Sequence, residues 1–250
     1  MTSVTFRAVA RRPRAFLRVA GPDAAEYLQR MLSNDVEALQ PGAACDALLL
    51  TAKARVIAPV RVLRRAETDF LLLTEPELGE RVRAELRRFR FAAKAEIEAE
   101  EHESWLVLGG DEVIDERPDG DEVDAEELER WRIEAGVPRW GHEIDERILP
   151  AEAGLTDTHV SFTKGCYPGQ EPIARQHYRG KVNRTLRVLE LEGGATPSRD
   201  AELILGEKAV GRITSAVPGL ALGYVRTEVP GGTALEWRSD GASGLARTRA

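Results

Sequence analysis

The sequence is poor in cysteine and in long apolar runs. Cys45 and Cys166 are its two cysteines in 250 residues, whereas an iron–sulfur cluster is usually held by about four thiolates. The unbroken aliphatic runs, such as residues 47–50 and 70–73, are far shorter than the roughly 20 apolar residues of a membrane-spanning helix. We therefore expect a chain that carries no cluster of its own and has no membrane partner.

The sequence also lacks the common signatures of enzymes and metal sites. It contains none of the motifs GxGxxG, GxxxxGK[ST], GxSxG, HExxH and CxxC. Its four histidines do not recur at the spacing that places metal ligands on one face of a helix. No metal site is expected, and most common enzyme classes lose their support in the sequence.

Basic residues are fewer than acidic ones: the sequence has 35 basic and 42 acidic residues, which gives a net charge of −7. Such a chain repels a phosphate backbone unless its positive charge is gathered on one face, so we expect no nucleic-acid partner. Two distant cysteines and no secretory apolar segment favour a reducing, cytoplasmic compartment. With 42% apolar residues, the chain can bury one large core or two modest ones.

The first two thirds of the chain predict helices mixed with strands, an α+β fold. We expect strands at residues 16–19, 56–63, 70–73 and 105–108, and helices after residue 23, after Pro76 and at 125–135. In the helix after Pro76, the apolar positions from Leu78 to Phe89 fall on one buried side, and its five arginines face solvent.

From Asn183 onward, short apolar runs alternate with glycine-containing turns and show no helical period. Several short strands at close spacing predict a small β-barrel. We therefore divide the chain into an N-terminal region, residues 1–182, and a C-terminal β-barrel domain, residues 183–250.

One loop-like segment, residues 163–175, places a single cysteine between glycines and a proline. Glycine suits a tight turn in which the backbone approaches another group closely, and a loop can display a thiol. Lys164 lies two residues before Cys166, and a helix is expected to begin near Gln170; both favour the thiolate. Cys166 is therefore a candidate reactive thiol with Lys164 as its helper, and the alternative is a small residue packed under a turn. Cys45, beside a strand-like run, is expected in the core.

A second candidate site is the segment 139–145, where Trp140, Gly141 and His142 precede Glu143. A carboxylate beside a glycine turn and an aromatic ring can pair with the flat amino-pyrimidine edge of a pterin. The alternative is an ordinary exposed acid.

The cysteine segment resembles the hallmark of the YgfZ-type folate-binding proteins, relatives of the glycine-cleavage T protein. That hallmark is a lysine–glycine–cysteine–aromatic–any–glycine–glutamine–glutamate run. Its fixed positions are matched by Lys164, Gly165, Cys166, Tyr167, Gly169, Gln170 and Glu171. The resemblance extends along most of the chain and includes the segments 21–23, 33–36, 132–138 and 148–152.

The resemblance implies a T-protein-like fold, in which two intertwined α+β subdomains bind folate and a β-barrel follows. It also implies tetrahydrofolate as the cofactor and a role in the assembly or repair of iron–sulfur clusters in client proteins. Glu143 matches the family's pterin-binding glutamate motif, and we place Tyr167 among the folate contacts. Basic residues near the cysteine can meet the anionic tail of a folate, on charge alone. These are Arg175, Arg179, Lys181 and Arg184.

The chain departs from the T protein in the stretch 54–60. T proteins carry paired aspartates there that support methylene transfer, whereas this chain has Ala58 and Pro59. Neither residue carries a charge to stabilise an iminium-like intermediate or to assist proton movement. Cys166 also stands where the T protein has an aspartate. We therefore expect a tetrahydrofolate-binding protein that supports iron–sulfur enzymes; the alternatives are a T-protein-like aminomethyltransferase and a non-catalytic interaction module.

Overall fold

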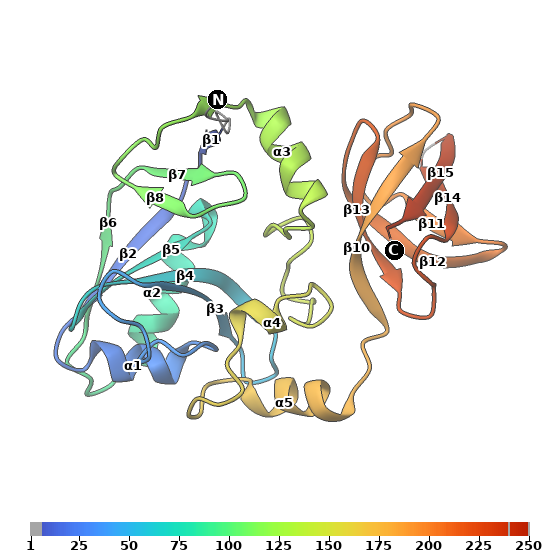
Figure 1. The fold of residues 1–250 in the computed structure, drawn as a ribbon. Coiled ribbons are helices and arrows are strands. Elements are labelled where there is room, and N and C mark those ends of the chain that lie inside the picture. The colour runs from blue at the N-terminus through green and yellow to red at the C-terminus, as the bar shows by residue number, and fades with distance from the viewer. Residues whose placement is uncertain (1–6, 240, 250) are drawn as a thin grey trace, which may run out of the picture. The chain divides into compact units, whose positions relative to one another are not determined.

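The chain forms two compact units in the computed structural model, which describes residues 7–239 and 241–249 (Figure 1). The first unit contains the described residues up to Glu122 together with Leu155–Arg175. The second contains Val123–Gly154 together with the described residues from Gln176 onward. The backbone therefore passes from one unit to the other three times.

A five-stranded antiparallel sheet in the order β3-β4-β5-β2-β6 forms the centre of the first unit. Its strands are β2 (Ala15–Ala20), β3 (Ala44–Leu50), β4 (Val56–Ala66), β5 (Asp69–Thr74) and β6 (Glu96–Glu100). In the β4–β5 hairpin, Arg61 pairs with Leu73 and Leu63 with Leu71. β-Branched and aromatic residues favour strands, and the apolar side chains of β5 are all buried. The predicted strand pair is confirmed.

A four-stranded sheet in the order β8-β7-β1-β9 completes the strands of the first unit. Its members are β1 (Ala8–Arg11), β7 (Ser104–Val107), β8 (Glu112–Ile114) and β9 (Asp121–Glu122). β1 pairs antiparallel with β7, where Val9 lies opposite Val107, and parallel with β9. β1 is thus held by strands that are remote from it in sequence.

Helix α1 (Ala24–Met31) has one apolar side, which it buries in the first unit. The buried residues recur at helical spacing and are Ala24, Tyr27, Leu28 and Met31. The Tyr27 hydroxyl donates a hydrogen bond to the Leu86 carbonyl of the next helix, α2 (Gly79–Arg88). The expected helix after residue 23 is confirmed.

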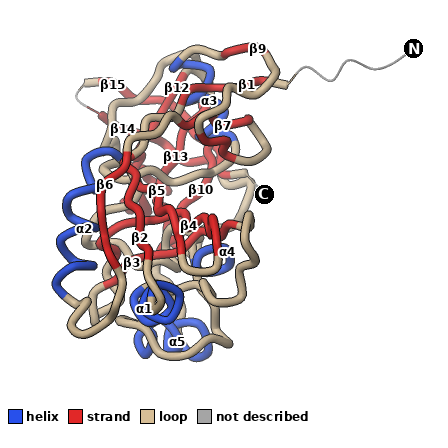
Figure 2. The backbone as a smooth tube through the Cα atoms, turned by 90° about the vertical axis from the view of Figure 1, so that its left-hand side faces the viewer, coloured by secondary structure: helices blue, strands red, loops and turns tan. Residues whose placement is uncertain are grey.

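Helix α2 follows a 3₁₀ turn, η1 (Pro76–Leu78), and runs alongside β6 (Figure 2). Val82 and Leu86 are buried, as the apolar spacing predicts. The prediction that Phe89 shares this buried side is wrong. The helix ends at Arg88, so the chain leaves the helical spacing before Phe89, whose side chain is exposed.

A closed six-stranded barrel and helix α3 (Ala125–Glu134) form the second unit. The barrel order is β10-β13-β12-β11-β14-β15. Its strands are β10 (Arg184–Glu192), β11 (Glu202–Leu205), β12 (Lys208–Val217), β13 (Leu220–Arg226), β14 (Ala234–Ser239) and β15 (Ala242–Thr248). Trp237 is completely buried in the barrel core, among aliphatic side chains such as Leu189 and Leu203. The predicted α+β fold with a C-terminal β-barrel is confirmed.

The predicted division into residues 1–182 and 183–250 falls just before β10. The two compact units have different boundaries from this division, because α3 packs against β12 and β13 and thereby groups Val123–Gly154 with the barrel. Asp124 starts α3 by accepting hydrogen bonds from the amides of Glu126 and Glu127. No helix among the described residues is both long and apolar enough to cross a membrane.

Candidate functional site

The cysteine segment lies in the first unit, between helix α4 (Thr156–His159) and helix α5 (Gln170–Arg179). It alternates between buried and displayed residues. Lys164, Tyr167 and Gly169 are buried, whereas Gly165 and Cys166 are exposed. The loop is therefore fixed at three points and presents the thiol between them.

Lys164 fixes the loop to the end of helix α1. Its Nζ donates hydrogen bonds to the carbonyl oxygens of Gln29 (2.5 Å), Leu32 (2.5 Å) and Asn34 (2.9 Å). An ammonium group has three donors, so all of them are used. Burial lowers the pKa of Lys164 to about 8. Lys164 is thus an anchor of the loop, and its expected help to the Cys166 thiolate stays a prediction.

Residues next to α1 hold the chain that leads into this loop. The Ser33 hydroxyl donates to the His159 carbonyl (2.6 Å) and accepts from the Leu48 amide (2.8 Å). The Asn34 side-chain amide donates to the carbonyls of Asp46 and Thr158. The sequence analysis assigned no role to these polar side chains. Their burial and contacts show that they help to position the cysteine segment.

Gly169 allows the other end of the loop to touch the β3–β4 hairpin. Its φ is +83°, and a Cβ atom at this position would lie 2.7 Å from the Thr51 carbonyl oxygen and 3.0 Å from the Ala54 Cα. Ala54 is itself buried and has a left-handed backbone, φ +58°, inside the tight turn from Thr51 to Arg55. Only glycine permits both the backbone angle and the close approach.

The two cysteines differ in environment. Cys166 is exposed, whereas Cys45 in β3 is only half-buried and is not the core residue that the sequence predicts. Burial together with the Asp46 charge raises the pKa of the Cys45 thiol to about 11, so this group is a neutral thiol at pH 7. Between the two, only Cys166 meets the requirement of access to solvent.

Helix α5 begins at Gln170, as expected, and carries two predicted folate contacts on its exposed side. Arg175 and Glu171 form an exposed ion pair at 2.8 Å, and Arg179 lies exposed in the last turn. Tyr167 faces the other way, because its ring is buried with its centroid 5.1 Å from the Lys164 Nζ. Burial raises the pKa of the Tyr167 hydroxyl to about 12.

The positions of the missing aspartates lie in β4. Ala58 is completely buried and pairs with Leu49, while Pro59 pairs with Leu48 and its carbonyl accepts a hydrogen bond from the Thr74 hydroxyl (2.8 Å). No carboxylate stands at either place. In this part of β4, Ala58 and Pro59 contribute to strand pairing and packing of the sheet.

Glu143 lies in the second unit and is buried in a hydrogen-bond network. Its Oε2 accepts from an Arg132 guanidinium nitrogen (2.9 Å) and from the Arg139 amide (3.0 Å). Its Oε1 accepts from the Ser215 hydroxyl of β12 (2.7 Å), and the Tyr224 hydroxyl donates to its carbonyl. The Glu143 side chain has no exposed surface. Pterin contact by this carboxylate stays a prediction, and it requires the network to open.

Neighbouring charges complete this network. Arg132 also pairs with Glu129 at 2.7 Å, and its guanidinium donates to Ser215 (2.8 Å). Burial opposes the charge on Arg132, but the hydrogen bond that Arg132 donates to Glu129 and the nearby carboxylates outweigh it and raise the pKa of Arg132. Burial and the charge of Arg139 lower the pKa of His142, so its imidazole is neutral at pH 7.

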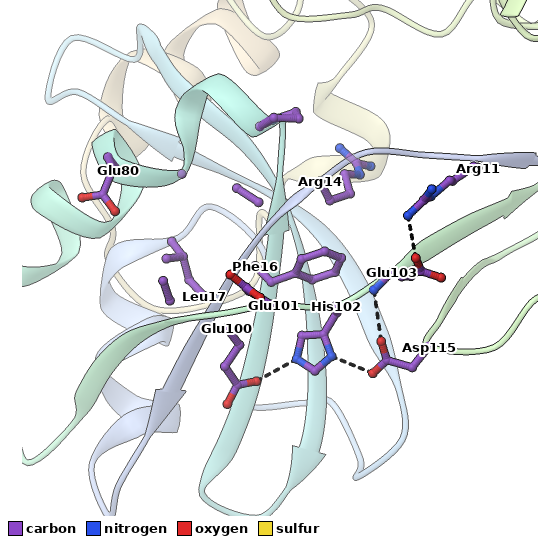
Figure 3. Close-up of a pocket in the computed structure, with 14 residues that line it drawn as sticks. Arg11, Arg14, Phe16, Leu17, Glu80, Glu100, Glu101, His102, Glu103 and Asp115 are labelled. Atoms are coloured by element: carbon purple, nitrogen blue, oxygen red, sulfur yellow. Dashed lines mark hydrogen bonds and ion pairs between the residues drawn. The ribbon is translucent and has the colours of Figure 1, made fainter.

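A cavity of about 620 Å³ in the first unit contains a histidine that the sequence analysis passed over (Figure 3). His102 contacts Glu100 at 2.9 Å through Nε2 and Asp115 at 2.6 Å through Nδ1. Burial opposes protonation, but the two carboxylates outweigh it and raise the pKa of His102. Its ring also packs edge-on against Phe16. Within residues 7–239 and 241–249, no three His, Cys, Asp or Glu side chains gather to hold a metal ion.

Several known proteins align with this chain over most of its length. No protein-family model matches it. The tRNA-modifying protein YgfZ of Edwardsiella ictaluri is 28% identical to it, over 76% of this chain and 73% of that protein. The mitochondrial iron–sulfur cluster assembly factor IBA57 of Mus musculus is 25% identical, over 86% of this chain and 76% of that protein.

A solved structure, the glycine cleavage system aminomethyltransferase T from Bartonella henselae, has the same fold. It superposes with a TM-score of 0.81 and 18% identity, over 98% of this chain and 85% of that one. The cysteine hallmark, the α+β units with their closed barrel, and these relatives agree with one another. The similarity to proteins named YgfZ and IBA57, together with this shared fold, supports a YgfZ-type member of the glycine-cleavage T-protein superfamily.

Proposed function

We propose that this protein binds tetrahydrofolate and supports the assembly or repair of iron–sulfur clusters in client proteins. The Cys166 thiol is its reactive group. The observation that carries the proposal is the construction of the cysteine segment, in which Lys164, Tyr167 and Gly169 are buried and Cys166 between them is exposed. A thiol that reacts with a partner needs this combination of a fixed position and access.

The names of the relatives give the proposal its direction. One relative is named for iron–sulfur cluster assembly and another for tRNA modification. Both names fit one activity if the clients include a cluster-containing enzyme that modifies tRNA. The protein itself has two cysteines, so the cluster belongs to the client.

Folate binding draws on the exposed side of α5. Arg175 and Arg179 would hold the anionic glutamate tail of the folate, because both guanidinium groups are exposed and a guanidinium pairs bidentately with a carboxylate. Glu143 would reach the pterin only after leaving Arg132 and Ser215. Tetrahydrofolate would supply a one-carbon carrier when bound.

A T-protein-like aminomethyltransferase is the second candidate, because the solved structure with the same fold carries that name. Against it stands the apolar pair in β4, where Ala58 is buried and Pro59 serves the sheet. A non-catalytic interaction module is the third reading. Methylene transfer from an aminomethylated lipoyl carrier at an enzymatic rate would favour the second candidate over the first.

The decisive experiment measures iron–sulfur enzymes in cells that lack the natural gene and carry variants of it. We expect Cys166→Ala to lower the activity of cluster-containing enzymes to the level of the gene deletion. Cys45→Ala is the matched control and should keep the wild-type level, since its neutral thiol is half-buried. Equal activity in wild type and Cys166→Ala would refute the role of the thiol.

Folate binding is measured separately, by titrating the purified protein with tetrahydrofolate. The variant Arg175→Glu/Arg179→Glu should weaken binding about tenfold or more, because two charge-assisted contacts are lost. Arg226→Glu, an exposed arginine of the barrel, is the control for net charge. Binding that is absent in the wild type, or equal in all three proteins, would contradict this part of the proposal.

A further inference from the structure

The end of helix α2 and the turn after it form an exposed patch of aromatic and basic side chains. We define this Phe–Arg patch by its members Arg87, Arg88, Phe89, Arg90, Phe91 and Lys94, all of which are exposed. Phe91 is 86% exposed and Phe89 41%. Among the large apolar side chains of the described residues, Phe91 is the most exposed. Exposing two aromatic rings to water does not stabilise the fold, so stability does not explain why they lie on the surface.

The backbone actively holds Phe91 outward. Its φ is +44°, in the left-handed region, within a turn where the Ala93 amide donates to the Arg90 carbonyl (2.9 Å). A bulky residue is strained in that region and keeps this conformation only where its surroundings impose it. Arg87 secures the segment, because its guanidinium donates to the Ile97 carbonyl of β6 at 2.8 Å. The turn is therefore a fixed protrusion of the first unit.

The patch has the opposite charge to the protein. Residues 79–94 contain six basic and two acidic residues, although the whole chain has a net charge of −7. The Arg88 guanidinium lies over the Phe89 ring, 5.1 Å from its centroid. Arg90 and Lys94 also line a neighbouring cavity of about 720 Å³, together with Arg18. The positive charge thus surrounds the rings, whereas the hollow beside them is mixed in charge, because Asp69 and Glu96 also line it.

From this geometry we infer that the Phe–Arg patch docks the protein onto an anionic lipid bilayer. Phenylalanine rings favour the boundary between headgroups and acyl chains, while arginine and lysine pair with lipid phosphates around them. The apolar residues of α2, Val82 and Leu86, are buried, so the turn alone enters the membrane. Such contact is peripheral and reversible. The expectation of no membrane partner came from the shortness of the apolar runs, and run length does not register a local cluster of this kind.

Nucleic acid and protein partners fit the patch less well. Single-stranded RNA is bound by stacking bases on open ring faces along a basic groove, but Arg88 covers a face of the Phe89 ring. A protein hot spot is usually a flatter surface with a central anchor, whereas Phe91 stands out at the tip of a turn. An anionic bilayer matches both the protruding rings and the charge.

The inference is tested by sedimenting the full-length protein with vesicles of phosphatidylcholine alone and of phosphatidylcholine mixed with phosphatidylglycerol. We expect binding to the mixed vesicles at low ionic strength and none to the neutral ones. Arg88→Glu/Lys94→Glu should lower the partition coefficient at least tenfold, since each cation near an anionic surface contributes roughly fivefold. Phe91→Ser should lower it about fivefold by removing the inserted ring.

Matched controls change the same chemistry elsewhere. Leu245→Ser removes an apolar side chain that is 47% exposed on the barrel, and Arg226→Glu reverses an exposed charge there. Both should bind vesicles within twofold of wild type. Absence of binding to mixed vesicles, or equal losses in patch and control variants, would overturn the inference. Binding of a labelled oligouridine that the patch variants abolish, without vesicle binding, would reassign the patch to nucleic acid and overturn it as well.

Discussion

The loop around Cys166 and the turn around Glu143 are each stabilised by a buried charged residue, but the hydrogen-bond partners of the two charges differ. Lys164 is satisfied by three backbone carbonyls and has no carboxylate partner among its hydrogen bonds. Glu143 is satisfied mainly by the side chains of Arg132 and Ser215, with one backbone amide, that of Arg139, as a further donor. Main-chain carbonyls hold a loop to a fixed element, whereas a buried ion pair joins two side chains that must both be present. The first arrangement leaves its neighbour Cys166 exposed, while the second leaves no exposed surface on Glu143.

The comparison teaches that a charged residue in a motif can serve the fold while a neighbour stays exposed. Lys164 and Glu143 are both charged motif residues that the sequence makes candidates for function. Both have their hydrogen-bonding groups used inside the fold. Substitutions that remove individual contacts test whether the two regions differ as their hydrogen bonds indicate.

Glu143→Ala should produce the largest effect. It leaves the Arg132 guanidinium buried beside Ser215 without one of its carboxylates, which costs about 3–5 kcal/mol of unfolding free energy. Urea unfolding followed by tryptophan fluorescence measures this loss. Glu171→Ala, which breaks an exposed pair, is the control and should change stability by less than about 0.5 kcal/mol. Equal stability of both variants would show that the Glu143 network contributes little.

Lys164→Met should come next, with a loss of about 3 kcal/mol, because three carbonyl acceptors lose their donor. The loop should also loosen, so the rate of Cys166 alkylation should change. Lys181→Met, an exposed lysine, should leave both quantities as they are. If Lys164→Met changed the alkylation rate but not the stability, its role would be electrostatic, contrary to the anchor described here.

Gly169→Ala should destabilise the protein by about 2 kcal/mol, since the new Cβ meets the Thr51 carbonyl and the backbone is left-handed. The motif supplies its own control in Gly165→Ala, where a Cβ atom has no neighbour within 4 Å. Thermal unfolding of the two variants separates them. A similar midpoint for both would show that the contact with the β3–β4 hairpin gives way easily.

Replacing His102 should have the smallest effect on stability, because its charge is only partly buried between two carboxylates. Its pKa is raised in the folded protein, so its stabilisation is complete below the unfolded value of about 6.5 and is lost as the pH rises through the folded value. His102→Gln should therefore lower stability by less than about 1 kcal/mol near pH 5.5, and match wild type at pH 9. His177→Gln is the control. A difference that grows toward high pH would contradict the assigned sign.

Local features of the chain were predictable and distant pairings were not. The spacing of apolar residues identifies α1 and α2, and the hallmark around Cys166 identifies the superfamily. β1 escapes prediction because its partners, β7 and β9, lie about a hundred residues further on. Phe89 continues the helical spacing but follows the last helical residue, Arg88, so the pattern alone placed it on the wrong side.

The candidate site shows the same limit. The residue types around Cys166 predict a displayed thiol and a helix at Gln170, because both depend on neighbours in the chain. The partners of Lys164 lie about 130 positions earlier, at the end of α1, and Ser215 lies 72 positions after Glu143. Such contacts arise only from the fold, and they turn two apparently free charges into internal ones.

The way the chain passes between its units has a consequence for its synthesis. The cysteine segment belongs to the first unit but is made after Val123–Gly154, which belongs to the second. The carbonyls of Gln29 and Leu32 at the end of α1 are therefore synthesised more than a hundred residues before Lys164, the residue that donates hydrogen bonds to them. Completion of the first unit and presentation of the thiol then occur as one event. A chain that stops before this segment lacks both Cys166 and the lysine that anchors its loop, so the thiol and its support are added together.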